Sequence, residues 1–466
     1  MSSGNGHRNE ETVTRTRRRA FTASLVGTSL EWYDYFIFAS AAALVFNKLF
    51  FPSFDPLTGT LLSLATFTAG FVVRPLGAMV FGHFGDRVGR KQALTMSLLI
   101  VGASTFLIGA LPTYASVGVL APVLLVLLRM AQGFALGGEW GGAVLISMEH
   151  GPQSRRGLFA TGPQLGVPIG NLLSAGVFAL LVVVLSEDQL LAWGWRIPFL
   201  LSGLLLGVGL YARLALEESP AFLKASASRE IVKAPVLETV RRHPRPLSLA
   251  IGARLGTDVA YYIFAVFILV YGTEELGLSR SQVLNGVLIG SAIQLFLIPW
   301  LGSLSDRVGR RVIYLVGAVA ATVWVFAFFP LMDTKQVGWV YVAAAGGFVA
   351  HGAMYAVQSS FIAELFPARV RYTGTSMGYQ LESIIGGGLA PIIAVALLAE
   401  TGGTLAVSLY TAAALAVTFA CVAIARETSG RVLDGFEEPA LDVRTERKPL
   451  FVRGEEAEKV EAGERV

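Results

Sequence analysis

The chain has 466 residues, of which 54% are hydrophobic and only 15% charged, with a formal net charge of +4. Soluble domains carry about 25% charged residues, and the mean hydropathy here is +0.60, so an ordinary soluble protein is excluded. Apolar runs of about 20 residues recur from Ala20 to Ala425, which predicts a polytopic, all-α membrane protein. These runs are too long and continuous for outer-membrane β-strands. The single cysteine, Cys421, excludes an intramolecular disulfide.

The hydropathy pattern predicts twelve transmembrane helices divided six and six. In chain order we expect them near residues 21–46, 57–83, 92–112, 118–148, 158–184, 193–216, 247–272, 281–302, 312–331, 337–365, 372–399 and 403–425. The domain organisation is then an N-terminal tail (1–19), a six-helix bundle (20–216), a polar linker (217–246), a second bundle (247–425) and a C-terminal tail (426–466). Both polar tails are expected to be mobile. The first apolar run continues past Asp34 to Phe46, which argues against a cleaved signal peptide.

Lysine and arginine collect in the loops on one side of the predicted helices. That side receives "RTRRR", "DRVGRK", "SRR", the linker, "DRVGRR", "ARVR" and the C-terminal tail. The positive-inside rule therefore predicts a protein of the cytoplasmic membrane, with both termini and the linker on the cytoplasmic side. The basic residues are thus explained by the orientation of the chain in the membrane. We therefore expect the lipid bilayer as a partner and no nucleic acid.

The two halves repeat each other. "GHFGDRVGRK" (82–91) follows the second helix and "GSLSDRVGRR" (302–311) follows the eighth, while "LISMEHGPQSRRG" (145–157) and "FIAELFPARVRYTG" (361–374) follow the fourth and tenth. Equivalent loops in two six-helix halves indicate a duplication, which is typical of alternating-access transporters.

The doubled loop motif resembles the signature of the major facilitator superfamily. Within it, "EWYDYFIF", "FVVRPLGAMVFGHFGDRVGRK", "RMAQGFALGGEWGGA" and "WGWRIPFLLSG" resemble the metabolite:proton symporter family, over roughly residues 20 to 425. The resemblance implies a major facilitator fold, two six-helix bundles around a central cavity. It also implies a substrate among carboxylates such as 2-oxoglutarate, citrate and shikimate, or among zwitterions such as proline and glycine betaine.

Charged residues of the repeated loops are predicted to form a cytoplasmic gate. Glu149 and Glu364 end the fourth and tenth helices and are natural partners for the arginines, in ion pairs that form when the transporter opens outward. The alternative is that these are solvated charges that only set orientation. The gate set is Asp86, Arg87, Arg90, Glu149, Asp306, Arg307, Arg310 and Glu364.

Carboxylates within the membrane helices are the candidates for proton coupling. A charge at the centre of a membrane helix costs about 2.5–3.5 kcal/mol on insertion scales, so Asp34 and Glu31 need a role. At 1.5 Å per residue, Asp34 lies about 20 Å into its helix, level with Arg74 and Arg129. Asp34 is the leading proton carrier, with a permanent Asp–Arg pair as the alternative. Glu31 extends a proton path or only accepts hydrogen bonds; Glu139 is a second proton candidate or a partner of cytoplasmic arginines.

Polar and aromatic side chains at similar depth are the candidates for substrate binding. Arginine binds carboxylates through a planar fork, although helix packing and charge neutralisation would also explain these arginines. Arg254 and Asp258 are spaced i, i+4 and are expected to pair within one helix; the aromatic residues and His351 also fit a structural role. The set is Arg129, Arg74, Gln132, Tyr33, Gln164, Arg254, Asp258, Tyr262, His351 and Tyr355.

Together these features predict proton-coupled uptake of a small organic anion, a mono- or dicarboxylate, by alternating access. The alternatives are uptake of a zwitterion in a cation–π cage built on Trp32 and the tyrosines, and efflux by proton antiport. No cofactor is expected beyond the coupling proton, and the chain is expected not to be an enzyme, because the sequence offers no nucleophile motif or metal cluster. A monomer is compatible with this mechanism.

Overall fold

The computed structural model describes residues 3–53, 56–227 and 232–430, and every regular element in these ranges is a helix. The first half contains six long helical segments, in which α7 and α8 together form the fifth: α1 (Ser3–Ala41), α3 (Pro56–Arg87), α4 (Arg90–Ala110), α6 (Leu120–His150), α7 (Arg156–Gln164) with α8 (Gly166–Val184), and α10 (Arg196–Leu214). Short helices α2 (Asn47–Leu49), α5 (Tyr114–Val117) and α9 (Glu187–Gln189) lie in its loops.

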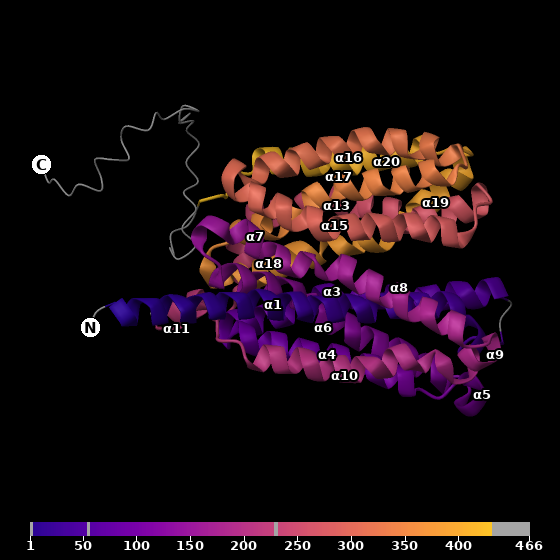
Figure 1. Cartoon of the computed structure of the whole chain (residues 1–466), viewed down its shortest axis with the longest axis horizontal. Coiled ribbons are helices and arrows are strands. Elements are labelled where there is room, and N and C mark those ends of the chain that lie inside the picture. The colour runs from indigo at the N-terminus through magenta and orange to yellow at the C-terminus, as the bar shows by residue number, and fades with distance from the viewer. Residues whose placement is uncertain (1–2, 54–55, 228–231, 431–466) are drawn as a thin grey trace, which may run out of the picture. The chain divides into compact units, whose positions relative to one another are not determined.

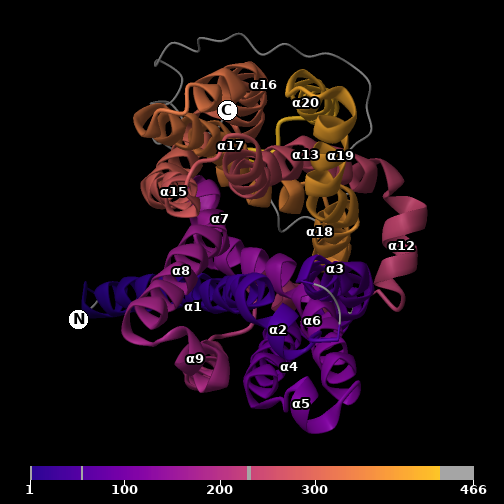
Figure 2. The ribbon, with the colours of Figure 1, turned by 90° about the vertical axis from the view of Figure 1, so that its right-hand side faces the viewer.

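The second half repeats this arrangement. Its segments are α13 (Pro244–Tyr262) with α14 (Ile268–Val270), α15 (Arg280–Val308), α16 (Arg310–Asp333), α17 (Val337–Glu364), α18 (Arg371–Gln380) with α19 (Ala390–Thr401), and α20 (Leu405–Ile424). Figure 1 shows the helices of the first half, indigo to pink, beside those of the second half, pink through orange to yellow. In the view along the helices, α7 and α18 lie at the boundary between the halves, and they pack against α15 and α3 respectively (Figure 2).

Ten of the described helical segments are long and apolar enough to cross a membrane, and α1 and α3 complete the two groups of six. Large apolar side chains point outward on these helices: Val183 is 84% exposed, Phe296 79% and Leu204 68%. In water such a surface would be unfavourable, whereas in a bilayer it faces lipid. The structure therefore agrees with the predicted polytopic membrane protein.

Two segments predicted as polar connections contain helices. α1 begins at Ser3, so residues 3–19 of the expected mobile tail continue the first membrane helix, because extending a helix already held by packing needs no new nucleation. The linker 217–246 contains α11 (Pro220–Ala227) and α12 (Pro235–Arg242). Residues 431–466 of the predicted C-terminal tail lie outside the described residues.

Glycine allows α3 and α6 to cross at very short distance. A Cβ atom on Gly133 would collide with the backbone of Gly70, and one on Gly137 would collide with the carbonyl oxygen of Arg74. Small residues let membrane helices approach in this way. The crossing fixes the positions of Arg74 on α3 and Arg129 on α6 relative to each other.

Candidate solute-binding and coupling site

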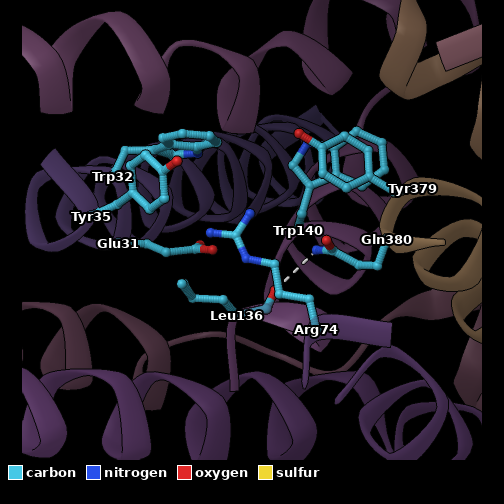
Figure 3. A pocket seen from close by; sticks show the side chains of 8 residues that line it. All are labelled: Glu31, Trp32, Tyr35, Arg74, Leu136, Trp140, Tyr379 and Gln380. Carbon is cyan, nitrogen blue, oxygen red and sulfur yellow. Dashed lines mark hydrogen bonds between the residues drawn. The ribbon is translucent and has the colours of Figure 1, made fainter. Parts of the chain in front are cut away.

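A small pocket lies where the two halves meet (Figure 3). Its lining comes from α1, α3, α6 and α18. The lining residues are Glu31, Trp32, Tyr35, Arg74, Leu136, Trp140, Tyr379 and Gln380. One carboxylate, one guanidinium and four aromatic rings thus surround a space that both halves build.

Aromatic contacts between the halves border this pocket. Trp140 of α6 stacks on Tyr379 of α18, with ring centroids 3.6 Å apart and planes 20° apart. The hydroxyl oxygens of Tyr35 on α1 and Tyr262 on α13 are 3.4 Å apart. Offset or stacked rings attract each other beyond the area they bury. Both contacts join helices of the two halves beside the pocket.

Arg74 and Glu31 face each other in the pocket. The guanidinium of Arg74 lies over the ring of Phe71, with its carbon atom 4.2 Å from the centroid, and points toward the Glu31 carboxylate (Figure 3). The two charges interact electrostatically. The helix-depth argument placed Arg74 level with Asp34. In the structure Arg74 faces Glu31, because residues 31 and 34 point about 60° apart around α1.

Asp34 lies outside the pocket lining, between α1, α4 and α10. Its carboxylate accepts hydrogen bonds from Thr105 (2.8 Å) and Ser202 (2.5 Å), and the charge of Arg129 acts on it. Gln132 connects the group, because it donates to Thr105 at 2.6 Å and accepts from Arg129 at 3.1 Å. The predicted proximity of Asp34 and Arg129 is confirmed, and Gln132 belongs to this internal network.

Glu139 is buried beside Arg213, with which it forms an ion pair, and it accepts a 2.5 Å hydrogen bond from Ser97. Of the two roles predicted for Glu139, pairing with an arginine is therefore seen directly. The sequence interpretation missed Arg213 because this residue lies near the end of α10, where an arginine is not distinguished by sequence from the basic residues of the loops.

In the second half, the charge of Arg254 is balanced by carboxylates of the same half. Arg254 makes the predicted i, i+4 pair with Asp258, with Nε–Oδ1 and Nη2–Oδ2 distances of 3.0 and 2.5 Å. Glu382 adds a second carboxylate 3.2 Å from Arg254 Nε. The guanidinium also lies 3.1 Å from the ring centroid of Tyr379, so it supports the pocket wall from behind. Neither Glu382 nor Tyr379 was among the residues predicted from the sequence.

The remaining predicted substrate contacts lie in helix–helix interfaces. Gln164 accepts from Trp140 Nε1 at 2.8 Å and donates to the carbonyl of Tyr355 at 2.7 Å, which joins the halves. His351 lies 2.9 Å from Gln294 through Nδ1 and stacks on the ring of Tyr355. Tyr33 donates to the carbonyl of Pro198 at 3.1 Å, on the side of α1 away from the pocket. Trp32, one position earlier, lines the pocket in its place.

The gate aspartates cap helices of the opposite half. Asp86 accepts from the backbone amides of Tyr372 (3.2 Å) and Thr373 (2.9 Å) at the start of α18. Asp306 accepts in the same way from Gly157 (2.8 Å) and Leu158 (3.1 Å) at the start of α7. Helix N-termini carry unpaired amides and a partial positive charge. These contacts hold the halves together at the end that carries the basic loops, which we call the basic end.

Two buried arginines, Arg90 and Arg310, form ion pairs next to the helix caps made by Asp86 and Asp306. Arg90 forms an ion pair with Glu149, which also accepts from Arg371 of the other half at 3.1 Å. Arg310 pairs with Asp306 at 2.8 Å and with Glu364 at 3.5 Å.

Arg87 and Arg307 were expected in the same ion pairs, and here the structure corrects the prediction. Both side chains are exposed, and Arg87 lies 3.2 Å from His83. Arg87 and Arg307 each lie three positions before the buried Arg90 or Arg310, on the other side of a glycine that interrupts the helix. Two glutamates that sequence reasoning missed cap the next helices: Glu218 accepts from the amide of Arg90 at 3.0 Å and Glu427 from that of Arg310 at 2.9 Å.

This architecture, two six-helix halves with a shared pocket and mutually capping loops, is that of membrane transporters built from internal repeats. The sequence matches the family described as Major Facilitator Superfamily over residues 24–391. The chain belongs to this superfamily, and it is accordingly a solute transporter and not an enzyme.

Relatives and solved structures agree with this assignment. An inner membrane metabolite transport protein of Escherichia coli (strain K12) is 41% identical over 427 residues, which cover 91% of this chain and 97% of the relative. The shikimate transporter of the same organism is 41% identical over 402 residues, 84% of this chain and 91% of the relative. A proline/betaine transporter of Salmonella typhimurium (strain LT2) is 34% identical over 446 residues, 93% of this chain and 88% of the relative.

The fold is also that of a solved proton:xylose symporter bound to 6-bromo-6-deoxy-D-glucose. The TM-score is 0.72 with 16% sequence identity, and the match covers 90% of this chain and 98% of the symporter chain. At this identity the likeness shows the shared fold, with the two halves in the same arrangement of helices.

Proposed function

We propose that the protein couples the uptake of a small organic anion, a mono- or dicarboxylate, to proton entry across the cytoplasmic membrane. The observation that carries this proposal is the guanidinium of Arg74 in the pocket between the halves. A planar guanidinium in a pocket lined by aromatic rings is suited to a carboxylate. The proton is the coupling ion, and Asp34, Glu31 and Glu139 are the candidates to carry it.

Two further membrane arginines, Arg129 and Arg254, are matched by carboxylates of the chain, as Arg213 is by Glu139. Arg129 faces Asp34, and Arg254 is held by Asp258 and Glu382. Arg74 differs because it lines the pocket, where a solute can reach it. We therefore assign Arg74 to the substrate and the other arginines to the framework around it.

Alternating access is supported by the contacts at the basic end. Asp86 and Asp306 bind helix starts of the opposite half, so that this end is closed. The positive-inside rule supports placing the basic end, with both termini, in the cytoplasm. A monomer suffices, because the two halves of one chain build the pocket.

A zwitterion is the second candidate substrate, and one observation favours it. The pocket pairs Glu31 with Arg74 and adds the rings of Trp32 and Trp140, which could hold a quaternary ammonium by cation–π attraction. The 34% identical proline/betaine transporter fits this alternative.

Reconstitution in liposomes tests the proposal. Radiolabelled shikimate, citrate, 2-oxoglutarate, proline and glycine betaine would be offered with an acidic outer solution, with an acidic lumen and with no gradient. We expect a carboxylate to accumulate only with the acidic outer solution. Accumulation of proline or glycine betaine alone would favour the second candidate, and uptake driven by the acidic lumen would indicate efflux by antiport in the cell. Gradient-independent flux of each accepted solute would refute proton coupling.

A further inference from the structure

We propose that Glu31 competes with the substrate carboxylate for Arg74, and that a proton on Glu31 admits the substrate. The inference rests on the proposed function, because it concerns how an anion enters that pocket. It assigns to Glu31, and not to Asp34, the step at which proton and substrate are linked.

The first argument is the position of the two side chains. Glu31 and Arg74 are 8% and 6% exposed, and both line the pocket. Figure 3 shows the carboxylate aimed at the guanidinium across the space. Within the described ranges, Glu31 Oε2 and Arg74 Nε have no hydrogen-bond partner. Each group therefore keeps bonding capacity at the pocket, which a buried polar atom normally does not.

The second argument is that three other membrane carboxylates, those of Asp34, Asp258 and Glu139, are held by hydrogen bonds. Asp34 accepts from Thr105 and Ser202, and Asp258 takes two hydrogen bonds from Arg254. Glu139 pairs with Arg213 and accepts from Ser97. A substrate could displace these carboxylates only by breaking the hydrogen bonds that hold them. Glu31 is the acidic residue of the pocket lining, and its partner is the basic one.

The third argument is the charge around Glu31. Arg74 on α3 and Arg213 on α10 attract the carboxylate, whereas Glu139 on α6 and Asp34 on α1 repel it. Protonation of Glu31 removes both repulsions and leaves Arg74 with an unbalanced positive charge. An unbalanced buried charge is costly, so a substrate carboxylate that restores the balance is favoured.

The net charge of the Glu31–Arg74 pair then links the binding of one proton to the binding of one substrate carboxylate. With Glu31 ionised, the pair is neutral, and a substrate carboxylate would place a second negative charge beside the first. With Glu31 protonated, Arg74 presents its fork to the substrate, and the loaded pocket is neutral again. A monocarboxylate would therefore enter with one proton and no net charge.

A zwitterion would use the same two residues with the opposite proton requirement. Its carboxylate would bind Arg74 and its ammonium would bind ionised Glu31, so that a proton on Glu31 would weaken binding. The two modes thus predict opposite pH dependences, which makes the pair a test of substrate class.

The experiment measures binding of radiolabelled shikimate, citrate and glycine betaine to the purified full chain between about pH 5.5 and 8.5. For a carboxylate bound by wild-type protein, we expect Kd to rise about tenfold per pH unit once Glu31 ionises, as for one linked proton. Glu31→Gln should bind the carboxylate at all pH values with the low-pH affinity. In liposomes it should exchange substrate across the membrane but lose gradient-driven accumulation.

Further variants test the role of Arg74 and provide a control for the Glu31 variant. Arg74→Gln should abolish carboxylate binding and Arg74→Lys should weaken it, because lysine lacks the planar fork. Asp188→Asn, an exposed carboxylate of α9, is the matched control and should keep the wild-type pH profile. Size-exclusion profiles and melting curves establish that each variant is folded.

Three results would overturn the inference. Glu31→Gln could keep the wild-type pH dependence, Asp34→Asn could remove that dependence in its place, or glycine betaine could bind best at high pH and lose binding in Glu31→Gln. Each leaves proton-coupled transport by the wild-type protein standing. Wild-type flux that ignores the proton gradient would instead refute the proposed function itself.

Discussion

Trp140 of the first half stacks on Tyr379 of the second, with ring centroids 3.6 Å apart, and donates its indole N–H to Gln164. Tyr379 in turn lies against the guanidinium of Arg254. One aromatic pair therefore connects the pocket wall, the interface between the halves and the charge cluster of the second half.

The first prediction concerns this stack. Trp140→Ala removes an aromatic pair worth about 0.5–1.5 kcal/mol and a buried hydrogen bond worth about as much, so the halves should separate more readily. We expect a lower melting temperature and faster substrate exchange in liposomes. Trp140→Phe keeps a ring but loses the N–H donor and should be intermediate. Equal behaviour of the two variants would show that the ring stack contributes nothing to closure.

The second prediction concerns the helix caps between the halves. Asp86→Asn and Asp306→Asn each weaken a charge–helix contact worth about 0.3–2 kcal/mol, and both act on the same closed state. Each should increase the population open at the basic end, and the double variant more so. Distances between spin labels attached to α3 and α18, in a chain with Cys421→Ser, would report the change.

Arg87→Gln is the comparison for the caps. The Arg87 side chain is exposed, so the structure predicts a smaller shift than for Asp86→Asn. An equal or larger shift would favour the interpretation in which the loop arginines themselves form the gate.

The third prediction concerns the buried pair of Glu139 and Arg213, both 1% exposed. Removing one partner of a buried ion pair typically costs about 3–5 kcal/mol, because the other charge remains uncompensated. Glu139→Gln and Arg213→Gln should each lower the melting temperature strongly, and the double variant should recover part of the loss. Additive losses would show that the two charges do not stabilise each other.

The fourth prediction concerns the crossing of α3 and α6. Gly133→Ala places a methyl group against the Gly70 backbone and should push α3 away from α6, which displaces Arg74 and Arg129 together. We expect reduced stability and loss of uptake. Gly176→Ala on α8 is the matched control, because a Cβ atom there meets no atom within 4 Å; it should transport normally.

Several features of this protein follow from the sequence by itself. Long apolar runs fix the membrane class, and the doubled "DRVGR" loops indicate two equivalent halves. The Arg254–Asp258 pair was also predictable, because residues four apart on a helix are neighbours whatever the rest of the chain does. These are all consequences of local composition and spacing.

Only the tertiary structure decided which charge faces which. Glu31 and Asp34 are one turn apart, yet one enters the pocket opposite Arg74 and the other is enclosed by α4 and α10. In a membrane protein both sides of a helix are apolar, so hydropathy does not reveal how the helix is rotated. That rotation is set by packing between helices distant in sequence, as at Gly133 against Gly70. The same packing places Trp140, Tyr379 and Arg213, which have no local signal to mark them.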